Sequence, residues 1–95
     1  MSKKKKSEKR KAQEQELLRR LHLPTGGDIP FEPPNEWHPT EPLQRGPKPK
    51  QGYIDKKGRE WTKGPTRTKG QDWEWDVQLP GGGHLNIDWD GIVTH

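Results

Sequence analysis

A carboxylate and an imidazole that could act on one substrate group lie close together in residues 72–91, DWEWDVQLPGGGHLNIDWDG. Asp76 supplies the carboxylate and His84 the imidazole, a group that takes up and releases protons near neutral pH. Two such groups can cleave RNA without a metal: one accepts the proton of the 2′-hydroxyl, and the other protonates the departing 5′-oxygen. DNA lacks the 2′-hydroxyl, so this chemistry would select RNA.

Alternating side chains predict the strands that position these groups. Apolar and polar residues alternate in residues 72–79 and 84–89, so each segment indicates a strand with one buried face. A shift of one residue, which would pair Leu79 with His84, sets apolar side chains against polar ones, and pairing Gln78 with His84 avoids this. Its opposed pairs are Gln78–His84, Val77–Leu85, Asp76–Asn86, Trp75–Ile87, Glu74–Asp88 and Trp73–Trp89.

A second turn would extend the polar face. Asp90–Gly91 is a strong signal for a two-residue turn. The pairs that this turn creates are Trp89–Ile92, Ile87–Thr94 and Asn86–His95. In the register given above, Asp76 and His84 are already diagonal neighbours, at about 7 Å. The predicted catalytic residues are Asp76, His84, His95 and Glu74, and the predicted phosphate-binding residues are Lys63, Arg67, Lys69 and Asn86.

Plainer interpretations of the same residues stay open. Asp76 suits an ordinary exposed acid, His84 a residue at the edge of a loop, and His95 a frayed terminus. The tryptophans are core residues first, and only Trp37 or one left exposed would stack on RNA.

The acids next to the predicted site allow two further interpretations. Glu74 opposite Asp88 would be repelled unless a cation, a basic side chain or a proton relieved the pair. His84, His95 and Asp88 are acceptable metal ligands, although their spacing matches no established motif.

Composition limits the size of the folded unit. The chain has 95 residues, of which 23% are apolar and 34% charged, so much of it cannot bury enough surface to offset the entropy of ordering. There is no cysteine, which excludes disulfides and thiolate metal sites. No apolar segment follows the lysine run 3–6, so no signal peptide is expected, and no run is long enough to span a bilayer.

Three segments are expected along the chain. Residues 1–23 form a basic helical or disordered arm, in which the apolar stripe of 7–22 is too short to anchor in a core, so a solvated helix is predicted. Residues 24–50 hold eight of the ten prolines, which indicates a linker or extended strap with Phe31 and Trp37 as anchors. Residues 51–95 form the small β domain that carries the site.

The predicted fold class is mainly β. We expect a small, twisted, antiparallel sheet of four or five short strands, arranged in hairpins at 52–62, 72–89 and 86–95. In the first hairpin, Asp55 begins the turn and Gly58 supplies the positive φ of a bulged connection.

Charge is distributed unevenly. Residues 1–22 carry nine Lys or Arg against three acids, residues 51–70 carry six against two, and residues 71–95 carry five acids and no Lys or Arg. Basic segments beside an acidic strand pair suit a polyanion partner, although the first lysines could merely keep a tail soluble.

Several motifs follow one another between residues 37 and 95: GYIDKKGREWTKGPTRTKG, then EWDVQL, then GGGHLNIDWDG and a final TH. Together they resemble the polymorphic toxin type 17 domain of bacteria, with residues 1–36 outside the match. The elements WT, EWD-Q and GGHL are similar, more weakly, to the ribosome-cleaving nuclease domain of cloacin-type colicins.

The resemblance implies a small, basic, metal-independent RNase toxin without a cofactor, used in bacterial competition. It further implies synthesis in the bacterial cytoplasm, export without a cleaved signal peptide as the warhead of a larger secreted protein, and action in the cytoplasm of a target cell. A cognate acidic immunity protein would neutralise it. The initial Met and lysine arm would fit a detached toxin module or the tail of a broken reading frame.

The colicin-type catalytic aspartate falls on Asp76, but the histidine and glutamate of that site fall on Leu79 and Gly83. Either His84, together with His95, has taken over the acid–base role, or the copy is degenerate. The leading prediction is an endoribonuclease toxin acting on ribosomal RNA or tRNA. The alternatives are a non-catalytic nucleic-acid or ribosome-binding protein and, on the strap and charge alone, a docking partner in a secretion or phage particle.

Overall fold

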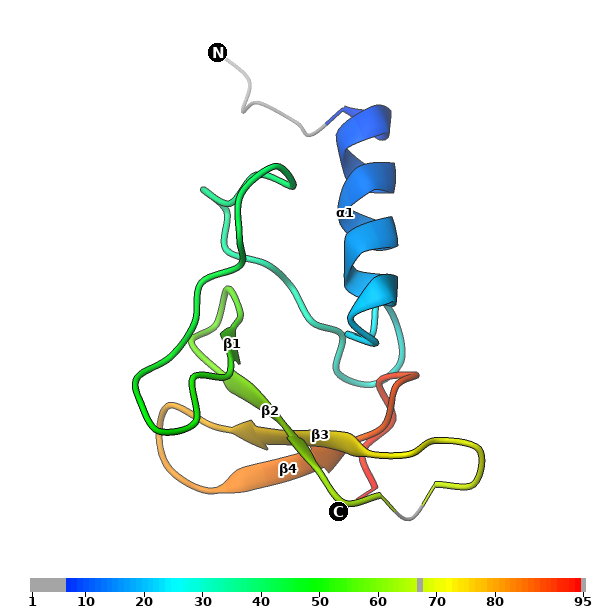
Figure 1. Ribbon diagram of the computed structural model, residues 1–95, viewed down its shortest axis with the longest axis vertical. Helices are drawn as coiled ribbons and strands as arrows, with labels where there is room; N and C mark the ends of the chain where they lie inside the picture. Colours follow the sequence, from blue (N-terminus) through cyan, green and yellow to red (C-terminus); the bar gives the residue numbers. More distant parts are fainter. Residues whose placement is uncertain (1–6, 67, 95) are drawn as a thin grey trace.

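The computed structural model describes residues 7–66 and 68–94 as one helix, an extended strap and one antiparallel sheet. In Figure 1 the helix stands over one end of the molecule, the sheet forms the other, and the strap passes between them. The sheet has four strands in the order β1-β2-β3-β4, which confirms the predicted mainly β class. The elements are α1 (Glu8–Arg20), β1 (Tyr53–Ile54), β2 (Glu60–Gly64), β3 (Glu74–Gln78) and β4 (His84–Ile87).

The register between β3 and β4 is the one that alternation predicts. Its four pairs, from Gln78–His84 to Trp75–Ile87, are all present. Trp75, Val77 and Ile87 are fully buried, because they share the face of the sheet that packs against the strap and the helix. The opposite face keeps the polar residues together.

The hairpin between β1 and β2 is built around Asp55, a carboxylate that is only 2% exposed. Its Oδ1 accepts hydrogen bonds from the backbone N–H groups of Lys57 and Arg59, both at 2.9 Å. Its Oδ2 accepts from Arg59 Nε at 2.6 Å and from Trp61 Nε1 at 3.0 Å. Gly58, with φ of 81°, closes the predicted bulged turn. One side chain therefore holds the turn and orients the central Trp61.

Replacing Asp55 by Ala is expected to destabilise the fold by about 3–5 kcal/mol, because it leaves a mostly buried guanidinium and a buried indole N–H without an acceptor. Urea unfolding followed by tryptophan fluorescence measures the change. Asp28→Ala, at an exposed loop position, is the matched control and should stay within about 0.5 kcal/mol of the parent. Equal stability of the two variants would contradict the role assigned to Asp55.

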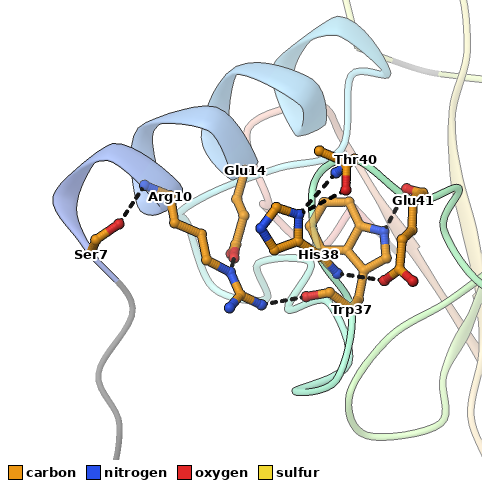
Figure 2. A network of polar contacts seen from close by, with 7 residues as sticks. All are labelled: Ser7, Arg10, Glu14, Trp37, His38, Thr40 and Glu41. Atoms are coloured by element: carbon orange, nitrogen blue, oxygen red, sulfur yellow. Dashed lines mark hydrogen bonds and ion pairs between the residues drawn. The ribbon is translucent and has the colours of Figure 1, made fainter.

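Helix α1 is anchored in the core, so the prediction of a solvated helix is wrong. Leu18 is only 4% exposed, and Leu17 and Leu21 pack against the same core. Figure 2 shows the polar side of this contact, in which Arg10 Nη2 donates to the backbone carbonyl of Trp37 at 2.6 Å. The apolar stripe is short, but the strap brings its own apolar side chains to meet it.

The strap is a structural element of this core. Its anchors Phe31 and Trp37 are buried as predicted, and Leu43 is a third. Trp37 Nε1 donates to the carbonyl of Glu41 at 2.9 Å, also visible in Figure 2. The core cluster thus includes residues from 1–23, 24–50 and 51–95, and the division of the chain at those boundaries stays a prediction.

The turn after β4 is wider than predicted. Ile87 pairs with Val93, and Thr94 N–H donates to the carbonyl of Asn86 at 2.8 Å, so the proposed Ile87–Thr94 pair is wrong by one residue. The cause is Asp88, whose Oδ1 accepts from the N–H groups of Asp90 and Ile92 and closes a larger loop.

Candidate functional site

Asp76 occupies the middle of β3, where Thr62 of β2 lies opposite it on one side and Asn86 of β4 on the other. The side chain is half-buried. Its Oδ1 is buried and has no hydrogen-bond partner among the residues that the structure describes. A buried carboxylate oxygen without a donor is costly, so such an atom in a native fold needs an explanation, and a substrate group is one.

His84 is the first residue of β4 and is exposed to solvent. Because it lies opposite Gln78, it is a diagonal neighbour of Asp76 on the polar face, as the predicted register requires. Within the described part of the chain, no hydrogen bond or ion pair joins the two side chains. A group bound between them would therefore find the imidazole accessible and one carboxylate oxygen free of other bonds.

Glu74 and Asp88, the opposed acids of the predicted register, each have hydrogen-bond donors of their own. Glu74 is 1% exposed, and its two oxygens accept from Thr66 Oγ1 at 3.3 Å and from Thr94 Oγ1 at 2.9 Å. The Asp88 carboxylate is turned into its own loop, where backbone N–H groups satisfy it. Hydroxyl and backbone donors stabilise the two acids separately, and a catalytic role for Glu74 stays a prediction.

The predicted phosphate-binding residues are dispersed. Asn86 lies on the polar face beside Asp76. Lys63 lies opposite Trp75, on the aromatic side, and its Nζ sits 4.8 Å from the centre of the Trp73 ring. Lys69 is exposed in the loop before β3. Arg67 and His95 lie outside the described residues.

A cavity of about 550 Å³ adjoins Asp76 and carries cations that sequence reasoning missed. Arg45 and Lys50 from the strap join Lys63 in its lining, together with Tyr53 and Asp76. The cavity lies where β1 ends, because β1 pairs with Trp61 and Glu60 only and leaves the rest of β2 as a free edge. Arg45 is held there by Gln51, whose carbonyl accepts from Nε at 2.6 Å, and by the face of Tyr53 at 4.3 Å.

The sequence carries a signal for these cations in the basic run RGPKPK at residues 45–50. Its prolines indicate a strap, and nothing in the local pattern says that the strap returns to the sheet. The pairing of Arg45 with Tyr53 makes that return.

The metal interpretation finds no cluster in the described part of the chain. No three His, Cys, Asp or Glu side chains there gather into a group that could hold an ion. The Asp88 carboxylate already accepts hydrogen bonds within its own loop, and His84 is a diagonal neighbour of Asp76 on the polar face.

Comparison with known families identifies the class of protein. The family model described as Novel toxin 17 matches residues 13–95, which is most of the chain, so this is a toxin module of the polymorphic kind. The chain belongs to the Novel toxin 17 family. No curated protein matches the chain, and no solved structure does.

The extent of this match corrects one expectation. It begins at residue 13, not at residue 37, so most of α1 and the whole strap belong to the matched domain.

Membership of a toxin family implies a cognate immunity protein. In the described part of the chain, no helix has the length and apolarity needed to cross a membrane.

Replacing Thr94 by Val should cost about 1–3 kcal/mol, because it removes the hydroxyl that donates to a buried oxygen of Glu74. Thr94→Ser keeps the donor and is the matched control. Urea unfolding of both variants checks this, and a Thr94→Val protein as stable as the parent would show that the hydrogen bond to Glu74 contributes nothing to stability.

Proposed function

We propose that the chain is an endoribonuclease toxin that cleaves ribosomal RNA or tRNA, with Asp76 and His84 as its acid–base pair. The observation that carries the proposal is the position of Asp76. It has a carboxylate oxygen without a described partner, and it lines a cavity that also holds Arg45, Lys50 and Lys63. An acid without a described partner in a cavity lined by cations suits phosphodiester chemistry.

The cations would hold the phosphate and stabilise the extra negative charge of the transition state. The 2′-oxygen attacks phosphorus, the bond from phosphorus to the 5′-oxygen breaks, and the products carry a 2′,3′-cyclic phosphate and a 5′-hydroxyl. One member of the pair takes the 2′-hydroxyl proton, and the other gives a proton to the leaving oxygen. His84 is well placed for exchange with solvent because it is exposed.

Toxin family membership supports a biological setting for this activity. The module would be delivered by a larger secreted protein and act on RNA in the cytoplasm of a target cell. The basic character of the chain, with a net charge of +4, favours an acidic immunity protein as the neutralising partner.

A non-catalytic RNA or ribosome binder is the second candidate. It is favoured by the absence of a bond between Asp76 and His84 in the described residues and by Leu79 and Gly83 at the colicin-type catalytic positions. Such a binder would hold RNA with an affinity that falls steeply with salt and would leave the RNA intact.

Asp76→Asn is expected to lower the rate of RNA cleavage by about 10²–10⁴-fold, because the amide keeps the shape but cannot exchange the proton. His84→Gln should have a comparable effect. Sequencing of RNA ends after incubation with purified protein measures both. Asp72→Asn, at an exposed acid just before β3, is the control and should cleave normally. Full activity in both site variants would contradict the assignment, and no cleavage by the parent would favour the binder.

Lys50→Ala should weaken RNA binding and lower the salt slope of the affinity by about one unit, because one phosphate contact is lost. Lys56→Ala is the charge-matched control, since Lys56 is exposed in the β1–β2 turn and does not line the cavity. Titration of a short RNA into the Asp76→Asn protein at several salt concentrations measures the difference. If the affinities of the two lysine variants depend on salt with the same slope, the cavity is not part of the RNA-binding site.

A further inference from the structure

The five tryptophans fall into two groups. Trp37, Trp61 and Trp75 are buried, and each donates its indole N–H to an acceptor inside the protein. Trp73 and Trp89 are half-buried. Neither makes an indole hydrogen bond within the described part of the chain, and Nε1 of Trp89 is buried without a partner there. These two rings therefore lack the polar tether that holds the other three in the core.

The two half-buried rings belong to a row that crosses one end of the sheet. Lys63 Nζ lies 4.8 Å from the centre of the Trp73 ring. Trp73 and Trp89 meet edge to face at 5.3 Å, and Trp89 stacks on His22 at 3.9 Å with only 19° between the ring planes. His22 also meets Trp73 edge to face at 5.7 Å, so the three rings contact one another. We call Trp73, Trp89 and His22, which Lys63 adjoins, the aromatic row.

His22 ends the row with a ring that solvent can reach. The residue is exposed and has φ of 61°, a conformation that residues other than glycine seldom adopt. Its backbone carbonyl accepts from Trp75 Nε1 at 2.8 Å, so the core holds the main chain in this position. The result is an imidazole stacked on Trp89 in a residue that is exposed to solvent.

Cations stand at both ends of the aromatic row. Lys63 also lines the cavity that holds Arg45 and Lys50, so the row begins where a phosphate would bind. At the other end, Arg19 joins His22 and Trp89 in the lining of a second cavity, of about 370 Å³. Flat rings between two positive charges match a single-stranded nucleic acid, whose bases stack while its phosphates bind cations.

We propose that the aromatic row is a base-stacking subsite for single-stranded RNA, with His22 and Trp89 as its platform. The identity of the ligand rests on the proposed nuclease function. The strand passes from the cationic cavity over Lys63 to the row, so the subsite holds nucleotides next to the scissile phosphate. Stacking is tolerant of sequence, because every base has a π face. The row therefore selects unpaired RNA over duplex.

Binding of uncleavable oligonucleotides to the full chain tests the subsite. A thymidine hexadeoxynucleotide lacks the 2′-hydroxyl, and an abasic hexamer has the same phosphates without bases. Tryptophan fluorescence titration should show that the thymidine hexamer binds about 5- to 150-fold more tightly, the range expected for one stacked base. Trp89→Leu should abolish this ratio and His22→Asn, which tolerates a positive φ, should reduce it. His38→Asn, on the strap, is the control and should leave it unchanged.

A measurement on the parent protein covers the case in which Trp89→Leu fails to fold. A hexamer carrying 5-iododeoxyuridine is irradiated with the protein, and the crosslinked residues are mapped. Crosslinks at His22, Trp73 or Trp89 support the row. Equal affinity for thymidine and abasic hexamers, or crosslinks only elsewhere, would overturn it and leave the row as a surface for a protein partner. If the protein cleaves RNA but binds the two hexamers equally, only the stacking subsite is excluded. If it binds the thymidine hexamer more tightly but does not cleave RNA, only the nuclease function is excluded.

Discussion

The buried carboxylate of Asp55 is the interaction on which most of the structure depends. It accepts four hydrogen bonds and so ties the β1–β2 turn to the indole of Trp61, which is fully buried. Trp61 contacts Phe31 of the strap and Trp75 of β3, each edge to face. Strap and sheet are therefore both positioned against a ring that one side chain orients, and a buried charge of this kind is stable only because every oxygen is used.

The two faces of the sheet then acquire different chemistry. Period-two alternation sends the apolar residues of β3 and β4 toward the strap and leaves Asp76, Asn86 and His84 together on the other face. The free edge of β2 joins these faces, because β1 is too short to cover it. At this edge Arg45 and Lys50 of the strap line a cavity together with Asp76. The cavity therefore lies where the pairing of β1 with β2 stops.

Local patterns predicted what depends on near neighbours. The helix formers, the Asp55–Gly58 turn and the pairing of β3 with β4 follow from propensity, turn chemistry and the cost of exposing apolar side chains. The predicted turn after β4 was wrong because a side chain formed hydrogen bonds that favour a different turn. Asp90–Gly91 favours a two-residue connection, but the Asp88 carboxylate captures two backbone N–H groups and widens the loop. Thr94 therefore takes the place opposite Asn86.

The sequence by itself determined the β3–β4 register, the diagonal placement of Asp76 and His84 and the toxin-like order of its motifs, because alternation and local spacing carry that information. Only the tertiary structure decided that α1 is anchored, that Arg45 and Lys50 line the same cavity as Asp76, and that His22 lies on Trp89. Those contacts join residues far apart in the chain through a proline-rich segment, whose path is set by packing against the sheet and not by any local preference.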